Sequence, residues 1–106
     1  MKLTKHALAA VELYPPERRG RRGPLLPGLW RADIGIGDIY KGQYSFGTIL
    51  DEPLGPGDVR KIFLTFGRPD LVIPLLSRGL KFFYCTGHAI GEGRIIDFSP
   101  DGLKDD

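Results

Sequence analysis

Hydrophobic residues along this chain occur in short runs, and glycine or proline separates most runs from the next. No apolar repeat with a helical period persists for about three turns, so the pattern favours strands over amphipathic helices. Segments that are rich in β-branched and aromatic residues, and bounded by Gly, Pro or Asp, predict six strands. These predicted strands are residues 7–14, 29–36, 43–50, 59–66, 80–86 and 91–98. Six strands within about 100 residues predict an all-β fold, in the form of a small barrel.

The clearest alternation of apolar and polar residues lies in the second predicted strand. Because successive side chains of a strand point to opposite faces, one face of this strand is core and the other is wet. The core face carries Trp30, Ala32, Ile34 and Ile36, and the wet face carries Arg31 and Asp33. In the last strand, Gly91 and Gly93 lie two residues apart, which indicates a neighbouring backbone or a bend at that face.

Several segments between the strands have their own signals. Pro69 and Pro74 flank an apolar stretch, and because proline cannot donate to a ladder this stretch is expected to be an edge strand or an ordered loop. Residues 38–42 are expected to form a hairpin loop. We expect one domain, 1–106, with frayed ends at about residues 1–6 and 99–106.

Cysteine and histidine are too few to support metal or disulfide chemistry. Cys85 is the single cysteine, so an internal disulfide is impossible, and His6 and His88 are the two histidines. Such a set does not supply the ligands of a typical zinc site, so we expect no metal and no cofactor. No apolar run approaches the roughly 20 residues that cross a bilayer, and we expect a cytoplasmic protein without membrane contact.

Charge is distributed unevenly along the chain. Residues 1–31 contain seven Lys and Arg against two Glu, a balance of +5, and residues 97–106 contain four Asp against one Lys, a balance of −3. Arg18, Arg19, Arg21 and Arg22 fall within five positions of a predicted loop. Guanidinium groups at this density match phosphate oxygens or an acidic protein surface. The alternative is a solvated loop in which one arginine pairs with Asp33 or Asp58.

Five short motifs, in a fixed order, resemble the C-terminal β-barrel domain of elongation factor Tu. They occur at residues 22–24, at 28–31, at 55–58, at 79–82, and at Gly87 together with 90–93. The similarity spans roughly residues 7–98 and implies a closed six-stranded antiparallel barrel. Agreement between this resemblance and the strand alternation predicts that Trp30, Ile34, Phe63 and Phe82 lie inside. In that family the barrel packs against the nucleotide domain, touches the T-stem of aminoacyl-tRNA and meets the exchange factor.

Departures from the family pattern fall where those contacts are made. Cys85–His88 replaces a longer turn that carries two arginines in the family, and Asp33 stands where the family has glutamine. Residues 38–47 replace a shorter segment of the family. The chain has no Gly-x-x-x-x-Gly-Lys-Ser/Thr phosphate loop, so we expect neither nucleotide binding nor GTP hydrolysis.

Three further groups of side chains have specific hypotheses attached. A thiol at Cys85 activated by His88 would make a small hydrolase, but we identify no orienting group and no oxyanion site. Glu92 and Arg94 are expected to form an ion pair. Among the aromatic residues, Tyr40 and Tyr44 are the ones that we expect to be available for stacking on bases.

These observations lead to two main hypotheses. The first is a non-enzymatic binding module that contacts tRNA or another RNA, or a translation factor or other protein. Its contact residues would be Arg18, Arg19, Arg21, Arg22 and Arg31. The alternative is a protein-interaction module without RNA binding that docks through the apolar segment 71–76. Its docking residues would be Leu71, Val72, Ile73 and Leu75, because exposed apolar patches commonly mark interfaces.

Overall fold

Six strands and three short helical segments make up the computed structural model, which describes residues 3–18, 23–36, 39–86 and 88–103. The strands are β1 (Ala7–Leu13), β2 (Gly28–Ile36), β3 (Ile39–Leu50), β4 (Val59–Phe66), β5 (Lys81–Cys85) and β6 (Ala89–Phe98). The helical segments are η1 (Pro16–Arg18), α1 (Pro69–Val72) and η2 (Ile73–Leu75). All six predicted strands are present, and their bounds shift by at most a few residues.

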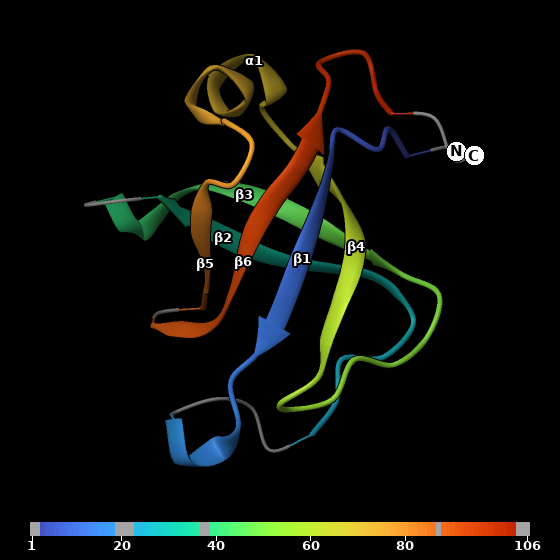
Figure 1. Ribbon diagram of the computed structural model, residues 1–106, viewed down its shortest axis with the longest axis vertical. Helices are drawn as coiled ribbons and strands as arrows, with labels where there is room; N and C mark the ends of the chain where they lie inside the picture. The colour runs from blue at the N-terminus through green and yellow to red at the C-terminus, as the bar shows by residue number, and fades with distance from the viewer. Residues whose placement is uncertain (1–2, 19–22, 37–38, 87, 104–106) are drawn as a thin grey trace.

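The strands close into an antiparallel barrel in the order β1-β4-β3-β2-β5-β6. This confirms the predicted all-β fold and the small closed six-stranded barrel. Strand β1 completes the barrel because it pairs with β4 on one side and with β6 on the other (Figure 1). Consecutive strands β2 and β3 form one hairpin, and β5 and β6 form another. Residues 39–42 belong to β3, so the expected hairpin loop at 38–42 is wrong for these four residues, and Asp38 lies outside the described residues.

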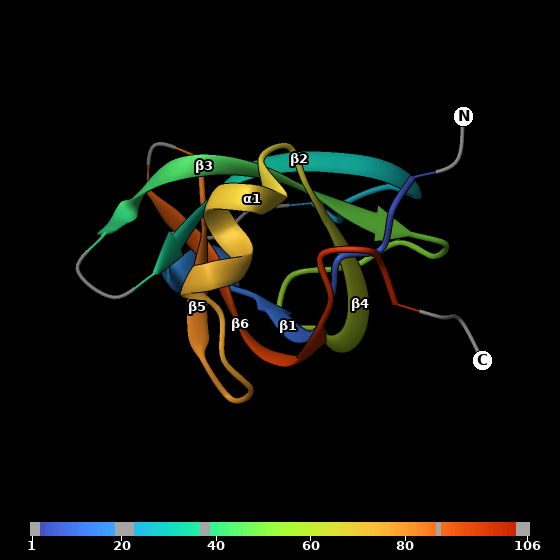
Figure 2. The same cartoon turned by 90° about the horizontal axis from the view of Figure 1, so that it is seen from above.

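The proline-flanked segment after β4 is helical, which corrects the expectation of an edge strand or loop. Pro69 is the first residue of α1, where proline is well tolerated because its fixed φ suits a helix and its missing N–H needs no partner. The amides of Leu71 and Val72 both donate to the Arg68 carbonyl. Figure 2 shows α1 lying across one end of the barrel, where Val72 is fully buried. The segment therefore closes that end.

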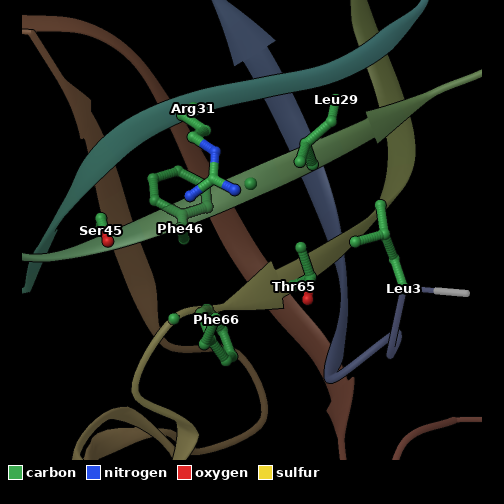
Figure 3. Close-up of a pocket in the computed structure, with 9 residues that line it drawn as sticks. Leu3, Leu29, Arg31, Ser45, Phe46, Thr65 and Phe66 are labelled. Carbon is green, nitrogen blue, oxygen red and sulfur yellow. The ribbon is translucent and has the colours of Figure 1, made fainter. Parts of the chain in front are cut away.

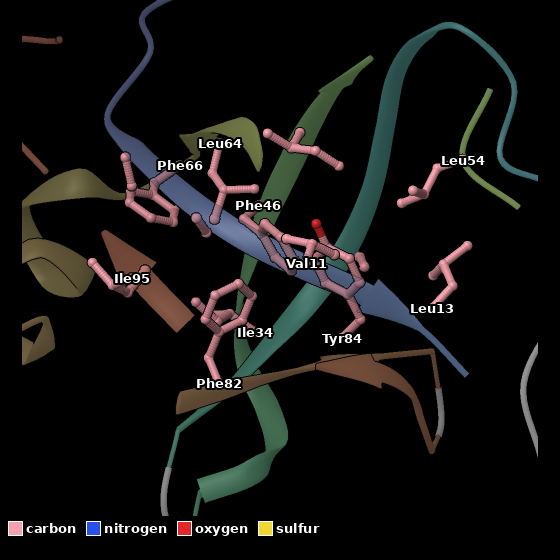
Figure 4. Packing of buried hydrophobic residues seen from close by; sticks show 14 of the residues in the cluster. Val11, Leu13, Ile34, Phe46, Leu54, Leu64, Phe66, Phe82, Tyr84 and Ile95 are labelled. Atoms are coloured by element: carbon pink, nitrogen blue, oxygen red, sulfur yellow. The ribbon is translucent and has the colours of Figure 1, made fainter. Parts of the chain in front are cut away.

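Three aromatic rings fill the centre of the barrel (Figure 4). The rings of Phe46 and Tyr84 stack at 4.9 Å between centroids, and Phe82 meets Phe46 edge-on at 6.1 Å. The fully buried Tyr84 hydroxyl shares a hydrogen bond of 2.8 Å with Thr48 Oγ1. Burial raises the pKa of Tyr84, so this hydroxyl stays protonated.

Two glycines of β6 make room for these rings. Gly93 is paired with Phe82 and Gly91 with Tyr84 across the β5–β6 ladder. A Cβ atom on Gly93 would lie 2.6 Å from Phe82 Cζ, and one on Gly91 would lie 2.7 Å from the Glu12 carbonyl oxygen of β1. The neighbouring backbone predicted for this face is therefore present, and an aromatic ring accompanies it.

Of the four residues that we expected inside, Ile34 and Phe82 are buried, and Trp30 is only partly buried at the edge of the core. Phe63 is wrong. The buried residues of β4 are Ile62, Leu64 and Phe66, so Phe63 points to the outer face, where Lys5 Nζ lies 4.8 Å above its ring. Every residue from Ile62 to Phe66 except Thr65 is hydrophobic, so composition did not distinguish the two faces.

The described parts of the two chain ends are bound to each other, which corrects the expectation of frayed ends. The Ser99 amide donates to the His6 carbonyl at 2.8 Å, and the Leu103 amide donates to the Lys5 carbonyl at 2.7 Å. His6 itself donates through its amide to the Leu64 carbonyl at 2.9 Å. Residues 1–2 and 104–106 lie outside the described residues.

His6 is expected to make the barrel sensitive to mild acid. Its ring stacks on Phe66, and its Nδ1 accepts a hydrogen bond of 2.9 Å from the Phe66 amide, which requires unprotonated Nδ1. Burial lowers the pKa of His6 below its ordinary value of 6.5, so the unfolded chain takes up a proton first. The contribution of neutral His6 to the free energy of unfolding is therefore complete above pH 6.5. It declines as pH falls from 6.5 through the folded-state pKa, by at most about 1.4 kcal/mol per pH unit.

Urea unfolding between pH 7.5 and 5 measures this effect. His6→Asn retains an acceptor oxygen without the titration and should show a flatter profile over this interval. His88→Ala, at an exposed histidine, should retain the wild-type profile. If His6→Asn had the same pH dependence of stability as the wild type, His6 would not be the group responsible for the acid sensitivity.

Candidate partner-binding surfaces

The arginine-rich segment begins where η1 ends. Arg18 is the last residue of η1, at the end of the barrel away from α1 (Figure 1). Arg19, Arg21 and Arg22 lie outside the described residues. Asp58, one of the carboxylates considered as an arginine partner, accepts a hydrogen bond of 2.8 Å from the Gly55 amide within its own turn.

Arg31 lies on the outer face of β2, as the strand alternation predicts, and its side chain is exposed. Across the sheet, Arg31 is paired with Gly47 of β3, and Gly47 with Thr65 of β4. No hydrogen bond or ion pair joins Arg31 to any part of the chain that the structure describes. Figure 3 shows its guanidinium extending from β2 toward β3, over a hollow of about 100 Å³. A cationic group that has no partner within the described ranges thus borders a concave surface.

The helical segment after β4 carries both buried and exposed apolar side chains. Leu71 and Leu75, four residues apart, are 40% and 42% exposed. Val72 has no exposed surface and Ile73 is half-buried against the core. Val72 therefore anchors the segment and is not available for docking, which leaves Leu71 and Leu75 as the exposed pair. Arg68 and Asp70 form an exposed ion pair of 3.0 Å beside them.

Cys85 and His88 lie at the β5–β6 hairpin, and the environment of the thiol disfavours catalysis. Cys85 is buried, and this burial, together with the negative charge of Asp33, raises the pKa of the thiol. Since the thiolate is the nucleophilic form, the site stabilises the unreactive form. His88 is exposed, and its carbonyl accepts a hydrogen bond of 3.0 Å from the Thr86 amide. The geometry does not support the thiol hydrolase hypothesis.

Glu92 pairs across strands instead of along its own strand. Its carboxylate lies 3.3 Å from Lys81 Nζ of β5 and accepts a hydrogen bond of 2.8 Å from the Tyr14 hydroxyl. Arg94, its expected partner, donates to the Gly79 carbonyl at 3.2 Å. Lys81 is the diagonal neighbour of Glu92, because Phe83 stands directly opposite Glu92 and Arg94 directly opposite Lys81. Long side chains bridge this diagonal separation of about 7 to 8 Å.

The remaining candidates are the two tyrosines for base stacking, a metal site and a membrane-spanning helix. Tyr44 packs against the core, which limits the ring surface available for base stacking. The side chain of Tyr40 lies outside the part of the chain that the structure describes. Within the described ranges, no group of three His, Cys, Asp or Glu residues could hold a metal ion. No helix among the described residues is both long enough and apolar enough to span a bilayer.

The hollow beside Arg31 was not expected from the sequence. Its floor exists because Gly47 has no side chain, and the signal for it was the glycine inside the predicted strand 43–50. The sequence matches no protein-family model and no curated protein.

Proposed function

We propose that this chain is a non-enzymatic binding module that resembles the C-terminal barrel of elongation factor Tu. In this proposal the barrel is a rigid scaffold, and its outer surface contacts RNA or a translation-related protein. Arg31 is the observation that carries the proposal, because it is an exposed guanidinium with no partner among the described residues. Arg18, Arg19, Arg21 and Arg22 would supply further guanidinium groups for the same partner.

RNA is the first partner to test, because guanidinium groups bind phosphates and release counterions. Affinity for a tRNA should fall with salt at a log–log slope of about −0.7 to −0.9 per phosphate contacted. Arg19→Ala/Arg21→Ala should make this slope shallower by roughly 1.5, and should change the free energy of unfolding by less than about 0.5 kcal/mol. Fluorescence anisotropy between about 50 and 300 mM salt measures the slope.

The matched control is Arg68→Ala/Arg78→Ala, which removes the same charge from residues that already pair with Asp70 and Asp97. This control should keep the wild-type slope. Undetectable binding at about 50 mM salt, or equal slopes in both double variants, would reject the arginine cluster as an RNA site.

A protein partner that docks on Leu71 and Leu75 is the second candidate. The supporting observation is that this exposed pair lies on a segment held in place by buried Val72. Apolar docking should persist at about 500 mM salt, where an interaction through arginines weakens. We therefore expect a protein retained from native lysate at that salt to be lost by Leu71→Ser/Leu75→Ser.

Leu26→Ser/Val59→Ser is the control for this second candidate, because Leu26 and Val59 are even more exposed, at 69% and 67%, and lie on other segments. It should retain the partner. Equal retention by both double variants would reject the Leu71 and Leu75 surface.

A further inference from the structure

The hollow on the outer face of β2, β3 and β4 has a specific shape. Arg31, Gly47 and Thr65 stand side by side in one row across the three strands. A Cβ atom on Gly47 would overlap Leu29 Cδ1 and would lie 3.0 Å from Thr65 Cγ2. The missing side chain therefore lets Leu29 lean over the strand and leaves a hollow of about 100 Å³. We call this hollow the Gly47 groove, and its lining consists of Leu3, Leu29, Arg31, Ser45, Phe46, Gly47, Thr65, Phe66 and Gly67.

The Gly47 groove combines two leucines with the hydroxyl residues Ser45 and Thr65 and one cationic group. Leu3 and Leu29, which line it, are 39% and 38% exposed, so each keeps free aliphatic surface. Figure 3 shows the Arg31 guanidinium beside Leu29, with Leu3 and Thr65 across the groove. Arg31 is the sole charged residue in the lining that the structure describes. Aliphatic surface and one cationic group thus face the same small space.

This combination selects the chemistry of an occupant. A guanidinium can donate two parallel hydrogen bonds to a carboxylate or to a phosphate, and only the carboxylate occurs beside aliphatic side chains in an unmodified protein segment. An aliphatic side chain that enters the hollow removes its own surface and that of the two leucines from water. We infer that the Gly47 groove docks a segment of a partner protein that presents an aliphatic side chain beside a carboxylate. This inference rests on the proposed function, because it specifies a partner for the same basic surface.

RNA fits the Gly47 groove less well. Phosphates and sugars gain nothing from leucine walls, and bases need exposed aromatic faces for stacking. The two aromatic residues of the lining, Phe46 and Phe66, are 2% and 4% exposed and face the core. RNA contact at Arg31 would therefore be electrostatic alone.

N-acetyl-leucine is a small probe that carries both required groups, and N-acetyl-leucinamide is its uncharged amide analogue. Titrated into the ¹⁵N-labelled full chain, N-acetyl-leucine should shift the amides of Arg31, Ser45, Gly47 and Thr65. A fragment of this size should bind with a dissociation constant of roughly 1 to 10 mM. N-acetyl-leucinamide should bind at least about fivefold more weakly. Equal shifts with both probes, or no localised shifts at about 20 mM, would overturn the inference.

Arg31→Gln removes the charge and keeps most of the side chain, and it should weaken N-acetyl-leucine binding by the same factor of about five. Arg94→Gln is the matched control, because Arg94 is an exposed strand arginine on β6 and should leave the affinity unchanged. Equal affinities of the two variants would overturn the role of Arg31.

Titration with oligouridylate separates this inference from the proposed function. Shifts from oligouridylate at these same amides, abolished by salt and without a response to N-acetyl-leucine, would overturn the inference in favour of RNA. Binding of oligouridylate elsewhere, again without a response to N-acetyl-leucine, would overturn the Gly47 groove alone and leave the binding module intact. Localised binding of N-acetyl-leucine that Arg31→Gln weakens by about fivefold would support the groove whether or not oligouridylate binds.

Discussion

Phe46→Ala is expected to lower the free energy of unfolding by about 3 to 5 kcal/mol, the range for deleting a buried aromatic ring. Phe46 is 2% exposed and contacts both other central rings, at 4.9 Å from Tyr84 and 6.1 Å from Phe82. Its removal leaves a cavity that surrounding strands of a closed barrel cannot collapse to fill. A domain with a typical total stability of about 5 to 15 kcal/mol would be close to unfolding. Equilibrium urea denaturation measures the loss.

Phe63→Ala is the matched comparison, because it removes the same atoms from the outer face. Phe63 keeps partial exposure and a contact with Lys5 at 4.8 Å, so its loss should cost less than about 1.5 kcal/mol. If the two variants lose equal stability, Phe63 contributes to the core and the assignment of faces in β4 is wrong.

Gly91→Ala is expected to destabilise the chain by about 1 to 3 kcal/mol or more, because one added methyl group overfills the site. The new Cβ atom would lie 2.7 Å from the Glu12 carbonyl oxygen, and 3.3 Å from Leu13 Cδ2 and Tyr84 Cδ2. A backbone oxygen cannot rotate away as a flexible side chain can, so β6 must shift relative to β1. Thermal unfolding should show the loss, which corresponds to several degrees for a domain of this size.

Gly23→Ala is the control, because no atom of the described residues, apart from its chain neighbours, lies within 4 Å of the Cβ position at Gly23. Its melting temperature should match or slightly exceed that of the wild type. A wild-type melting temperature for Gly91→Ala would mean that β1 and β6 are not as close as the structure has them.

Strand positions were predictable because they depend on local signals. Alternation in residues 29–36 and the glycine and proline breakers act over a few residues, and each of the six strands lies where these signals occur. Ile34 and Phe82 were correctly expected inside for the same reason. Phe63 was not, because apolar residues occur on both faces of residues 62–66 and only closure of the barrel turns Ile62, Leu64 and Phe66 inward.

The candidate surfaces were predictable only in part. Arg31 was expected on the solvent-facing side of its strand and is exposed there. Val72 was expected to contact a docked partner, but its side chain is fully buried. Pro69 is compatible both with an extended segment and with the first turn of a helix. The sequence of this segment therefore did not decide between the two conformations. Packing of Val72 into the open end of the barrel favours the helix.

By itself, the sequence determined the strand class, the approximate strand bounds, the exposed position of Arg31 and the absence of an internal disulfide, since each depends on residue type or local spacing. Tertiary structure decided which residues meet across strands. Glu92 contacts Lys81 and not Arg94, and Gly47 separates Arg31 from Thr65. These neighbours are 11 to 18 residues apart in the chain, and the barrel register joins them. In this register Phe82 and Tyr84 stand opposite Gly93 and Gly91 of β6, and both rings contact Phe46. A register is a property of all six strands together, so no local pattern contains it.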